Sequence, residues 1–187
     1  MIGTSDFKKG AKLLIDDQPY VITDFQHVKP GKGNQFTRTK MKNLISGTNL
    51  ERTIKSGEKF AVPDVEYVDM NFLYKDDSGF HFMNQSNYEQ LDLSAEVVGE
   101  PALFLTENLE VKICLFNERA ILIEVPNTVV LEVTETDPGH KGNTVTGATK
   151  PAILETGAKV YVPLHISIGD RLKVDTRTCE YLERTKG

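Results

Sequence analysis

Residues 12–28 read KLLIDDQPYVITDFQHV, which is two β-rich stretches separated by the turn sequence DDQP. Apolar and polar side chains largely alternate along these stretches, as in half-buried strands, and Asp and Pro mark the reversal between them. The pattern continues over residues 35–44 and 49–54, with further turns that contain Gly and Ser. Short strands at this close spacing predict an all-β barrel.

Similar stretches fill most of the remaining chain. Strands are expected at 67–74, 80–83, 111–116, 120–125, 128–134, 159–162, 171–174 and 180–182. One helix is expected over residues 100–109, because Pro101 suits a first helical turn and leucines follow it. Breaks near Pro63 and Pro126 divide the chain into residues 1–64, 65–127 and 128–187. We therefore predict an all-β protein of three consecutive small β-barrels.

Charge is distributed unevenly among the thirds of this 187-residue chain of net charge −5. Residues 1–64 carry 11 Lys and Arg against 7 Asp and Glu, residues 65–128 carry 3 against 12, and residues 129–187 carry 8 against 8. This asymmetry predicts segments with different partners. No apolar run is long enough for a membrane span or a signal peptide, and there are only two cysteines. A reduced, cytoplasmic protein without membrane contact is expected.

The sequence does not contain the residue patterns expected for nucleotide binding, metal binding or acid–base catalysis. A phosphate-binding P-loop around Lys32 would need glycine where Gln26 stands. The histidines and cysteines are too widely spaced for a metal site, and no acid–base pair stands out. We predict no catalytic residue, no metal and no cofactor, and a structural role for the Cys114 thiol. The middle third is also rich in aromatic residues, namely Phe72, Tyr74, Phe80, Phe82 and Tyr88. Because this segment is strongly acidic and would repel phosphates, we predict that these rings belong to the core and do not stack on bases.

The sequence PGKG at residues 30–33 places Lys32 at the apex of a tight turn between two strands. Proline fixes φ and glycine tolerates positive φ, so both glycines are expected to shape the turn and to leave the ammonium uncrowded. A macromolecule or a modifying enzyme could then approach Lys32 closely. The alternative is an ordinary hairpin turn with a solvated lysine.

A row of cations follows this turn. Arg38, Lys40 and Lys42 share one strand face at a spacing of roughly 6.6 Å, and residues 25–50 contain no acid to neutralise them. Such a row suits a phosphodiester backbone, although a merely solvated face is the alternative. The sequence PGHKGNT at residues 138–144 repeats the basic, Gly-rich turn, either as a second RNA contact or by coincidence.

Three sequence blocks together resemble the bacterial elongation factor P family. They are KPGKGNQF at residues 29–36 preceded by DFQHV, TDPGHKGNT at residues 136–144, and KPAILETGAKVYVPLHISIGD at residues 150–170. The blocks occur in the family's order and, with VDTR and Tyr181, span the whole chain. This chain has Asn143 where the family usually has Asp, and it has Cys179 where small residues are common.

The resemblance implies an SH3-like (KOW-type) barrel followed by two OB-fold barrels. It implies a monomeric factor that binds the ribosome beside the peptidyl-site tRNA and stimulates peptide-bond formation at consecutive prolines, without being an enzyme. Lys32 would receive an extension from a modifying enzyme, and Tyr181 and Arg184 would face the small subunit. The residues expected to contact tRNA or rRNA are Lys29, Gly31, Lys32, Gly33, Arg38, Lys40, Lys42, Gly142, Asn143 and Thr144. Two alternatives remain open, a generic single-strand RNA binder of OB folds and an unmodified paralogue of the factor.

Overall fold

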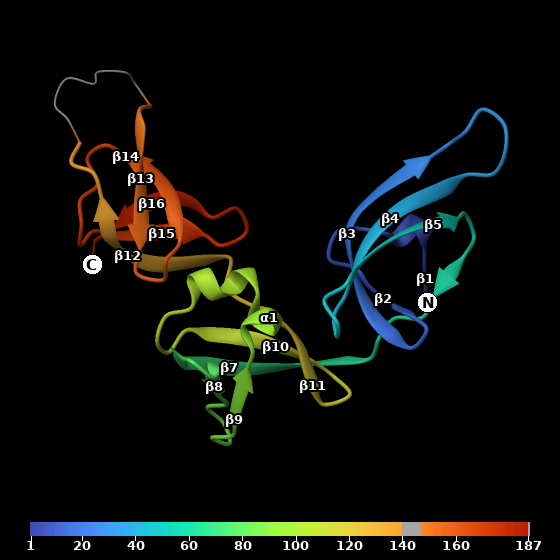
Figure 1. The fold of residues 1–187 in the computed structure, drawn as a ribbon, viewed down its shortest axis with the longest axis horizontal. Helices are drawn as coiled ribbons and strands as arrows, with labels where there is room; N and C mark the ends of the chain where they lie inside the picture. Colours follow the sequence, from blue (N-terminus) through green and yellow to red (C-terminus); the bar gives the residue numbers. More distant parts are fainter. Residues whose placement is uncertain (140–146, 187) are drawn as a thin grey trace. The chain divides into compact units, whose positions relative to one another are not determined.

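The computed structural model describes residues 1–139 and 147–186, and their regular secondary structure is almost entirely β-strand (Figure 1). The packing of the chain divides into two compact units. The first unit contains residues 1–66 and 115–122, and the second contains residues 67–114 and 123–187. The all-β prediction is confirmed, whereas the three-part boundaries at residues 64 and 127 stay a prediction.

A four-stranded antiparallel sheet in the order β2-β3-β4-β5 dominates the first unit. Its strands are Lys12–Ile15, Gln18–Val28, Phe36–Asn43 and Asn49–Lys55. The same unit holds β1 (Ile2–Gly3), which pairs with β6 (Lys59–Phe60), and the 3-10 helix η1 (Thr4–Asp6). The sheet is held by a hydrophobic cluster made of Ile2, Phe7, Leu13, Ile15, Ile22, Met41 and Ile54.

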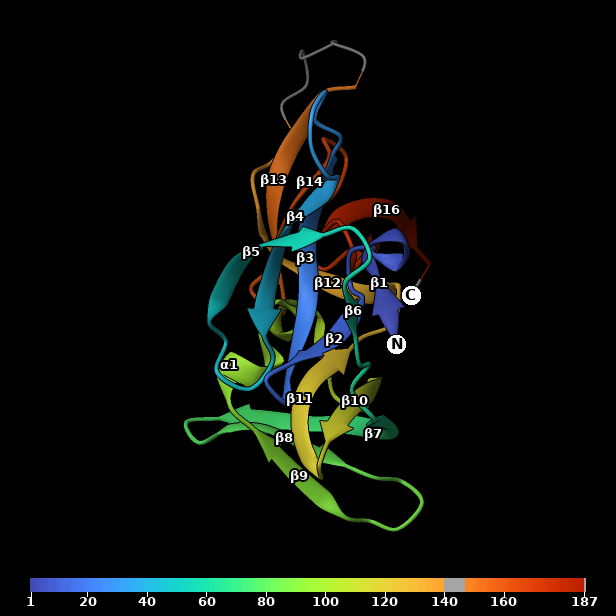
Figure 2. The same ribbon diagram turned by 90° about the vertical axis from the view of Figure 1, so that its right-hand side faces the viewer.

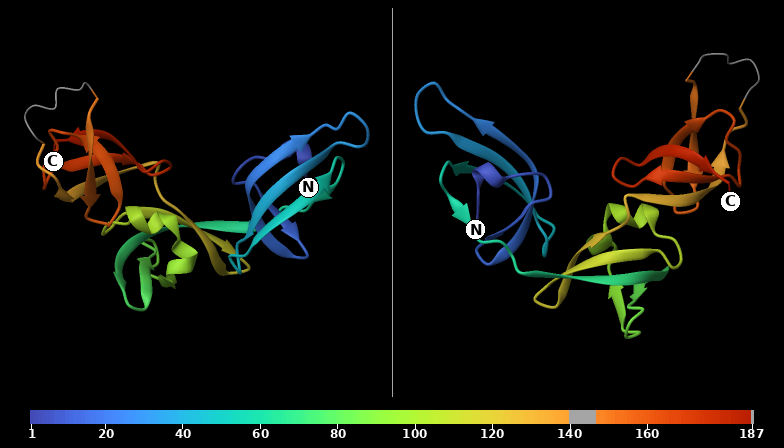
Figure 3. Two further views of the ribbon diagram at one scale, coloured as in Figure 1. Left: turned by 45° about the horizontal axis from the view of Figure 1, so that its top comes forward. Right: turned by 180° about the vertical axis from the view of Figure 1, so that it is seen from behind.

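The hairpin of β3 and β4 is the longest pairing in this sheet. The two strands pair from Tyr20 with Asn43 to Val28 with Phe36. They run side by side up to the loop of residues 29–35 (Figures 2 and 3). The hairpin of β3 and β4, called the β3–β4 arm below, therefore carries the predicted lysine loop at its end.

The second sheet has the order β11-β10-β7-β8-β9. Its strands are β7 (Val65–Asp76), β8 (Gly79–Met83), β9 (Gln90–Leu93), β10 (Glu110–Phe116) and β11 (Arg119–Glu124). The pairing of β7 with β8 shifts between Phe72 and Tyr74. Such a bulge reverses which side chains point inward, so Phe72 is buried whereas Tyr74 is 54% exposed.

The prediction that all five aromatic residues of this region belong to the core is therefore wrong in two places. Phe72, Phe80 and Phe82 are buried, and their rings lie near one another. Tyr74 leaves the core because of the bulge. Tyr88 is 72% exposed at a positive φ of 60°, in the turn between β8 and β9.

The predicted helix over residues 100–109 is also wrong. The chain forms a short α1 (Ala95–Val98) and then the 3-10 helix η2 (Glu100–Phe104). Ser94 caps α1, and Gly99, with φ of 63° and ψ of −143°, ends it before η2 begins. The backbone is extended again at Leu105, so the leucines do not line one helix face. No helix within the described residues is long and apolar enough to cross a membrane.

The third sheet, in the order β14-β13-β12-β15-β16, lies in the second unit. Its strands are β12 (Thr128–Thr136), β13 (Thr149–Leu154), β14 (Lys159–Pro163), β15 (Arg171–Asp175) and β16 (Glu180–Thr185). Strand β13, which contains Pro151, was not predicted from the sequence. Phe104 of η2 belongs to the same hydrophobic cluster as the inward side chains of this barrel, and Thr156 Oγ1 donates a hydrogen bond to Leu103 O at 2.5 Å.

Candidate functional site

Lys32 is an exposed residue in the loop that joins β3 to β4. Of its two neighbouring glycines only Gly33 has a positive φ, 107°. A Cβ atom built on either glycine would meet no atom within 4 Å. Among the described residues, the loop is therefore open on both sides of the lysine. Lys29 is exposed in the same loop.

The base of this loop is held by contacts between its two strands. His27 Nδ1 lies 2.9 Å from Thr37 Oγ1, and the rings of Phe25 and His27 meet edge to face at 5.4 Å. Beyond the last strand pair, the backbone N–H of Ser56 donates to Gln35 O at 3.0 Å. These contacts fix the root of the arm and leave the lysine itself exposed.

Strand β4 carries the predicted row of cations. Its burial alternates along the strand, so Arg38, Lys40 and Lys42 share the exposed face. The inward face carries Thr37, Thr39, Met41 and Asn43, all buried. The Arg38 guanidinium also lies over the Phe36 ring, 5.9 Å from its centroid. The single exposed basic face that the sequence predicted is present.

The same row is not free of acids in three dimensions. In the sheet, Lys40 pairs with Asp24 of β3 on one side and with Glu51 of β5 on the other. These two acids stand just outside the acid-free window of residues 25–50, and β pairing brings both of them beside its central lysine. The acid-free window of the sequence is therefore not an acid-free neighbourhood in the sheet at Lys40.

The remaining predicted contact residues that the structure describes, Tyr181 and Arg184, lie on β16. Gly142, Asn143 and Thr144 are outside the described residues. Tyr181 is half-buried and packs against the barrel core. Arg184 is exposed, and its guanidinium lies 3.9 Å from the carboxylate of Asp170. The roles of these residues stay predictions.

A carboxylate–histidine cluster in the second sheet was missed by the sequence analysis. His81 Nε2 lies 2.8 Å from Asp76 Oδ1, and its Nδ1 lies 2.6 Å from Asp92 Oδ1. These hydrogen bonds raise the pKa of His81, the one with Asp76 contributing most. Hydrogen bonds from Ser78 and then from His81 lower the pKa of Asp76 to about 2. The cluster arises because β8 lies between β7 and β9 in the sheet, which local sequence patterns do not reveal.

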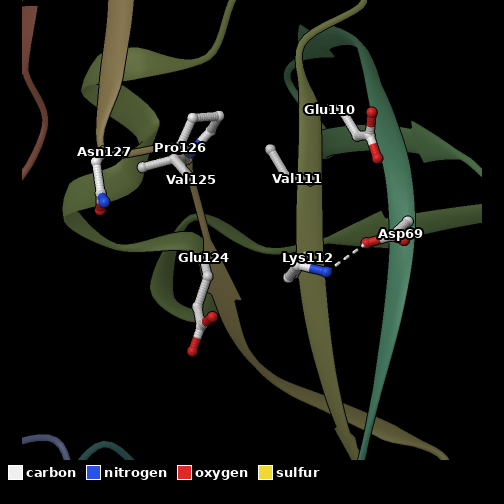
Figure 4. A pocket seen from close by; sticks show the side chains of 8 residues that line it. All are labelled: Asp69, Glu110, Val111, Lys112, Glu124, Val125, Pro126 and Asn127. Atoms are coloured by element: carbon white, nitrogen blue, oxygen red, sulfur yellow. Dashed lines mark hydrogen bonds and ion pairs between the residues drawn. The ribbon is translucent and has the colours of Figure 1, made fainter.

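An acidic hollow of about 390 Å³ lies beside β7, β10 and β11 (Figure 4). It is lined by Asp69, Glu110, Lys112 and Glu124 together with Val111, Val125, Pro126 and Asn127. Lys112 Nζ reaches Asp69 at 3.0 Å, and this contact raises the pKa of Lys112. Two further carboxylates, Glu110 and Glu124, line the hollow, so this surface would repel a phosphate.

The described residues contain no group of three or more His, Cys, Asp or Glu side chains placed to hold a metal ion. Cys114 is buried, as predicted, and Cys179 is partly buried. The described surface thus contains a cationic strand beneath an exposed lysine loop and a separate acidic surface in the second sheet.

Comparisons with known proteins identify the class. The description "Elongation factor P (EF-P) KOW-like domain" matches residues 3–60, "Elongation factor P (EF-P) OB domain" matches residues 65–123, and "Elongation factor P, C-terminal" matches residues 129–184. A KOW-like domain followed by an OB domain, with these matches, defines a translation elongation factor and not a classical enzyme. The chain belongs to the elongation factor P family.

Two bacterial relatives support this assignment over at least 98% of the chain. The chain is 60% identical over 184 residues to elongation factor P of Bdellovibrio bacteriovorus, covering 98% of each chain. It is 49% identical over 187 residues to elongation factor P of Magnetococcus marinus, covering all of both chains. Among solved structures, translation initiation factor 5A of Methanococcus jannaschii matches with a TM-score of 0.49 and 22% identity, over 66% of this chain and 94% of that chain.

Proposed function

We propose that this elongation factor binds the ribosome beside the peptidyl-tRNA, stimulates peptide-bond formation and relieves stalling at consecutive prolines. The observation that carries the proposal is the placement of Lys32. It is exposed at the end of the β3–β4 arm, and the exposed cations of β4 lie on the same arm. The family assignment supplies the context of translation.

The arm would act by positioning. Proline is a poor nucleophile, and its ring misplaces the reacting ends, so holding the acceptor end of the tRNA in near-attack geometry lowers the barrier. Each tenfold acceleration requires only about 1.4 kcal/mol, which a few charge-assisted hydrogen bonds can supply. No residue of the factor has to donate or accept a proton in this scheme, so the ribosome remains the catalyst.

Lys32 would carry a post-translational extension added by a separate enzyme. The open space around Gly31 and Gly33 favours this, because an enzyme must approach the amine closely. The factor would act as a cytoplasmic monomer. Residues Gly142, Asn143 and Thr144 would provide a second contact near the exit site, and Tyr181 and Arg184 would face the small subunit.

The test replaces Lys32 by Ala and by Arg. Neither change should alter folding, because an exposed loop residue usually changes stability by no more than about 0.5 kcal/mol. Synthesis through a Pro-Pro-Pro message should slow severely with both variants, while a proline-free message is read at the normal rate. Arginine keeps the charge but cannot accept an extension built on a primary amine.

Two results would count against the proposal. Full activity of Lys32→Ala on the Pro-Pro-Pro message would reduce the loop to an ordinary turn. Full rescue by Lys32→Arg would leave simple charge as the explanation and remove the modification. The intact mass of the protein purified from its native cells, with peptide mapping around Lys32, should show the extension directly.

A further inference from the structure

The cations of β4 differ in what lies opposite them in the sheet. Arg38 pairs with Gln26 on β3 and Thr53 on β5, and neither of these is charged. Lys42 pairs with Val21 and Asn49, which are also uncharged. Lys40 alone has a carboxylate residue directly opposite on both neighbouring strands.

These carboxylates belong to the same exposed face as the lysine. Asp24 and Glu51 are both exposed, and residues directly opposite in an antiparallel sheet have Cβ atoms only about 4.5–5.5 Å apart. A polar hollow of about 230 Å³ lies at this place, lined by Asp24, Phe25, Gln26, Arg38, Lys40 and Glu51. Lys40 and its two cross-strand partners therefore carry two negative charges for one positive charge, and Arg38 lines the same hollow.

We infer that Asp24 and Glu51 are specificity-determining residues of this surface, which admits an RNA backbone at Arg38 and at Lys42 but repels a phosphate at Lys40. The inference rests on the proposed function and names the kind of RNA that fits. Arg38 and Lys42, the two cations that would bind phosphates, are four residues apart, or roughly 13 Å along the strand. A folded RNA whose backbone curves away between two phosphates satisfies both of them.

An extended single strand does not fit in the same way. Its phosphates follow one another closely, so one of them would have to lie over the two carboxylates. At physiological salt, charges are screened over about 8 Å, so the carboxylates repel a phosphate in the hollow most strongly, and they repel a phosphate at Arg38 or Lys42, about 6.6 Å along the strand, less. Repulsion of the wrong partner is a common route to specificity. Here it would keep the factor from binding unstructured RNA.

The experiment compares two double variants that remove the same charge. Asp24→Asn with Glu51→Gln removes the proposed filter, and Asp64→Asn with Glu66→Gln removes two exposed acids of the same unit that do not pair with β4. The probe is a 20-nucleotide oligouridylate, and binding is followed by fluorescence anisotropy at several salt concentrations. We expect the first variant to bind at least about fivefold tighter than the control, with a salt slope steeper by about 0.7, as for one added single-strand phosphate contact.

Equal binding by the two double variants would overturn the inference. Ribosome affinity of Arg38→Gln with Lys42→Gln, compared with Lys40→Gln, provides the second measurement. We expect the double change to weaken binding several times more than the single change. If Lys40→Gln is as harmful as the double change, the inference fails and the proposed function stands. If neither the double change nor Lys40→Gln alters ribosome affinity, β4 is not the RNA-binding surface, and both the inference and the proposed function fail.

Discussion

The exposed face of β4 in the first unit and the β7–β8–β9 region of the second unit use charge in opposite ways. On β4, Arg38 and Lys42 face only uncharged cross-strand partners, so their charge is available to a ligand. In the second region, His81 lies between Asp76 and Asp92, so the charge of the protonated ring is compensated by the protein's own carboxylates. The comparison teaches that the partners of a charge, more than the net charge of a segment, decide whether a surface can bind RNA.

The largest difference should appear in footprinting of the bound ribosome. A hydroxyl-radical probe is attached at Thr53→Cys, on β5 opposite Arg38, or at Asp77→Cys, in the turn between β7 and β8. Cys179→Ser removes the partly buried native thiol, and Cys114 is buried. Strong cleavage of rRNA or tRNA is expected from residue 53 and only background cleavage from residue 77. Equal cleavage from the two positions would end the contrast between the two surfaces.

The next effect concerns the stability of the second region and its dependence on pH. Because the pKa of His81 is raised above 6.5, the protonated ring stabilises the fold fully below that pH. This stabilisation is lost as the pH rises through the pKa of the folded state. Asp76, with a pKa of about 2, stays ionised throughout.

His81→Gln should therefore lower the melting temperature by several degrees at pH 5.5 and by less at pH 8.5, measured by circular dichroism. His165→Gln serves as the control, because His165 is exposed and no contact with a carboxylate is found for it among the described residues. A deficit that is the same at both pH values would show that His81 acts by packing and not by charge.

The smallest effect distinguishes the two glycines of the lysine loop. Gly33→Ala places a side chain at a φ of 107°, whereas Gly31 has no positive φ and open space around it. We expect Gly33→Ala to lower the free energy of unfolding by roughly 1 kcal/mol more than Gly31→Ala, measured by urea titration. Equal losses would mean that the loop is not held in this conformation.

Local sequence patterns predicted the fold where strands pair with near neighbours. The period-two pattern of residues 36–43 gave the exposed row on β4, because alternation is a property of a single strand. The same pattern failed at Tyr74, since the bulge that exposes it depends on pairing with β8. It failed over residues 100–109, where the 3-10 helix η2 ends at Phe104 and the backbone is extended at Leu105.

The sequence predicted only those parts of the candidate site that lie in one continuous segment of the chain. Lys32 and the cations of β4 stand in one continuous segment and could be recognised there. The flanking acids Asp24 and Glu51 are 16 and 11 residues from Lys40, and only the register of the sheet brings them beside it. Register depends on the whole sheet, so the position of these two acids beside Lys40 could not be predicted from the acid-free window.

The burial of Phe104 has a consequence for how the chain is made. Phe104 is synthesised before any strand of the barrel whose cluster it joins, and that barrel is complete only when β16 ends at Thr185. Until then the aromatic side chain lacks its final neighbours, so the segment that contains Phe104 leaves the ribosome that synthesises it with this apolar side chain uncovered. Its folding is completed by a segment translated later, and a nascent chain interrupted between the two would be a substrate for chaperones.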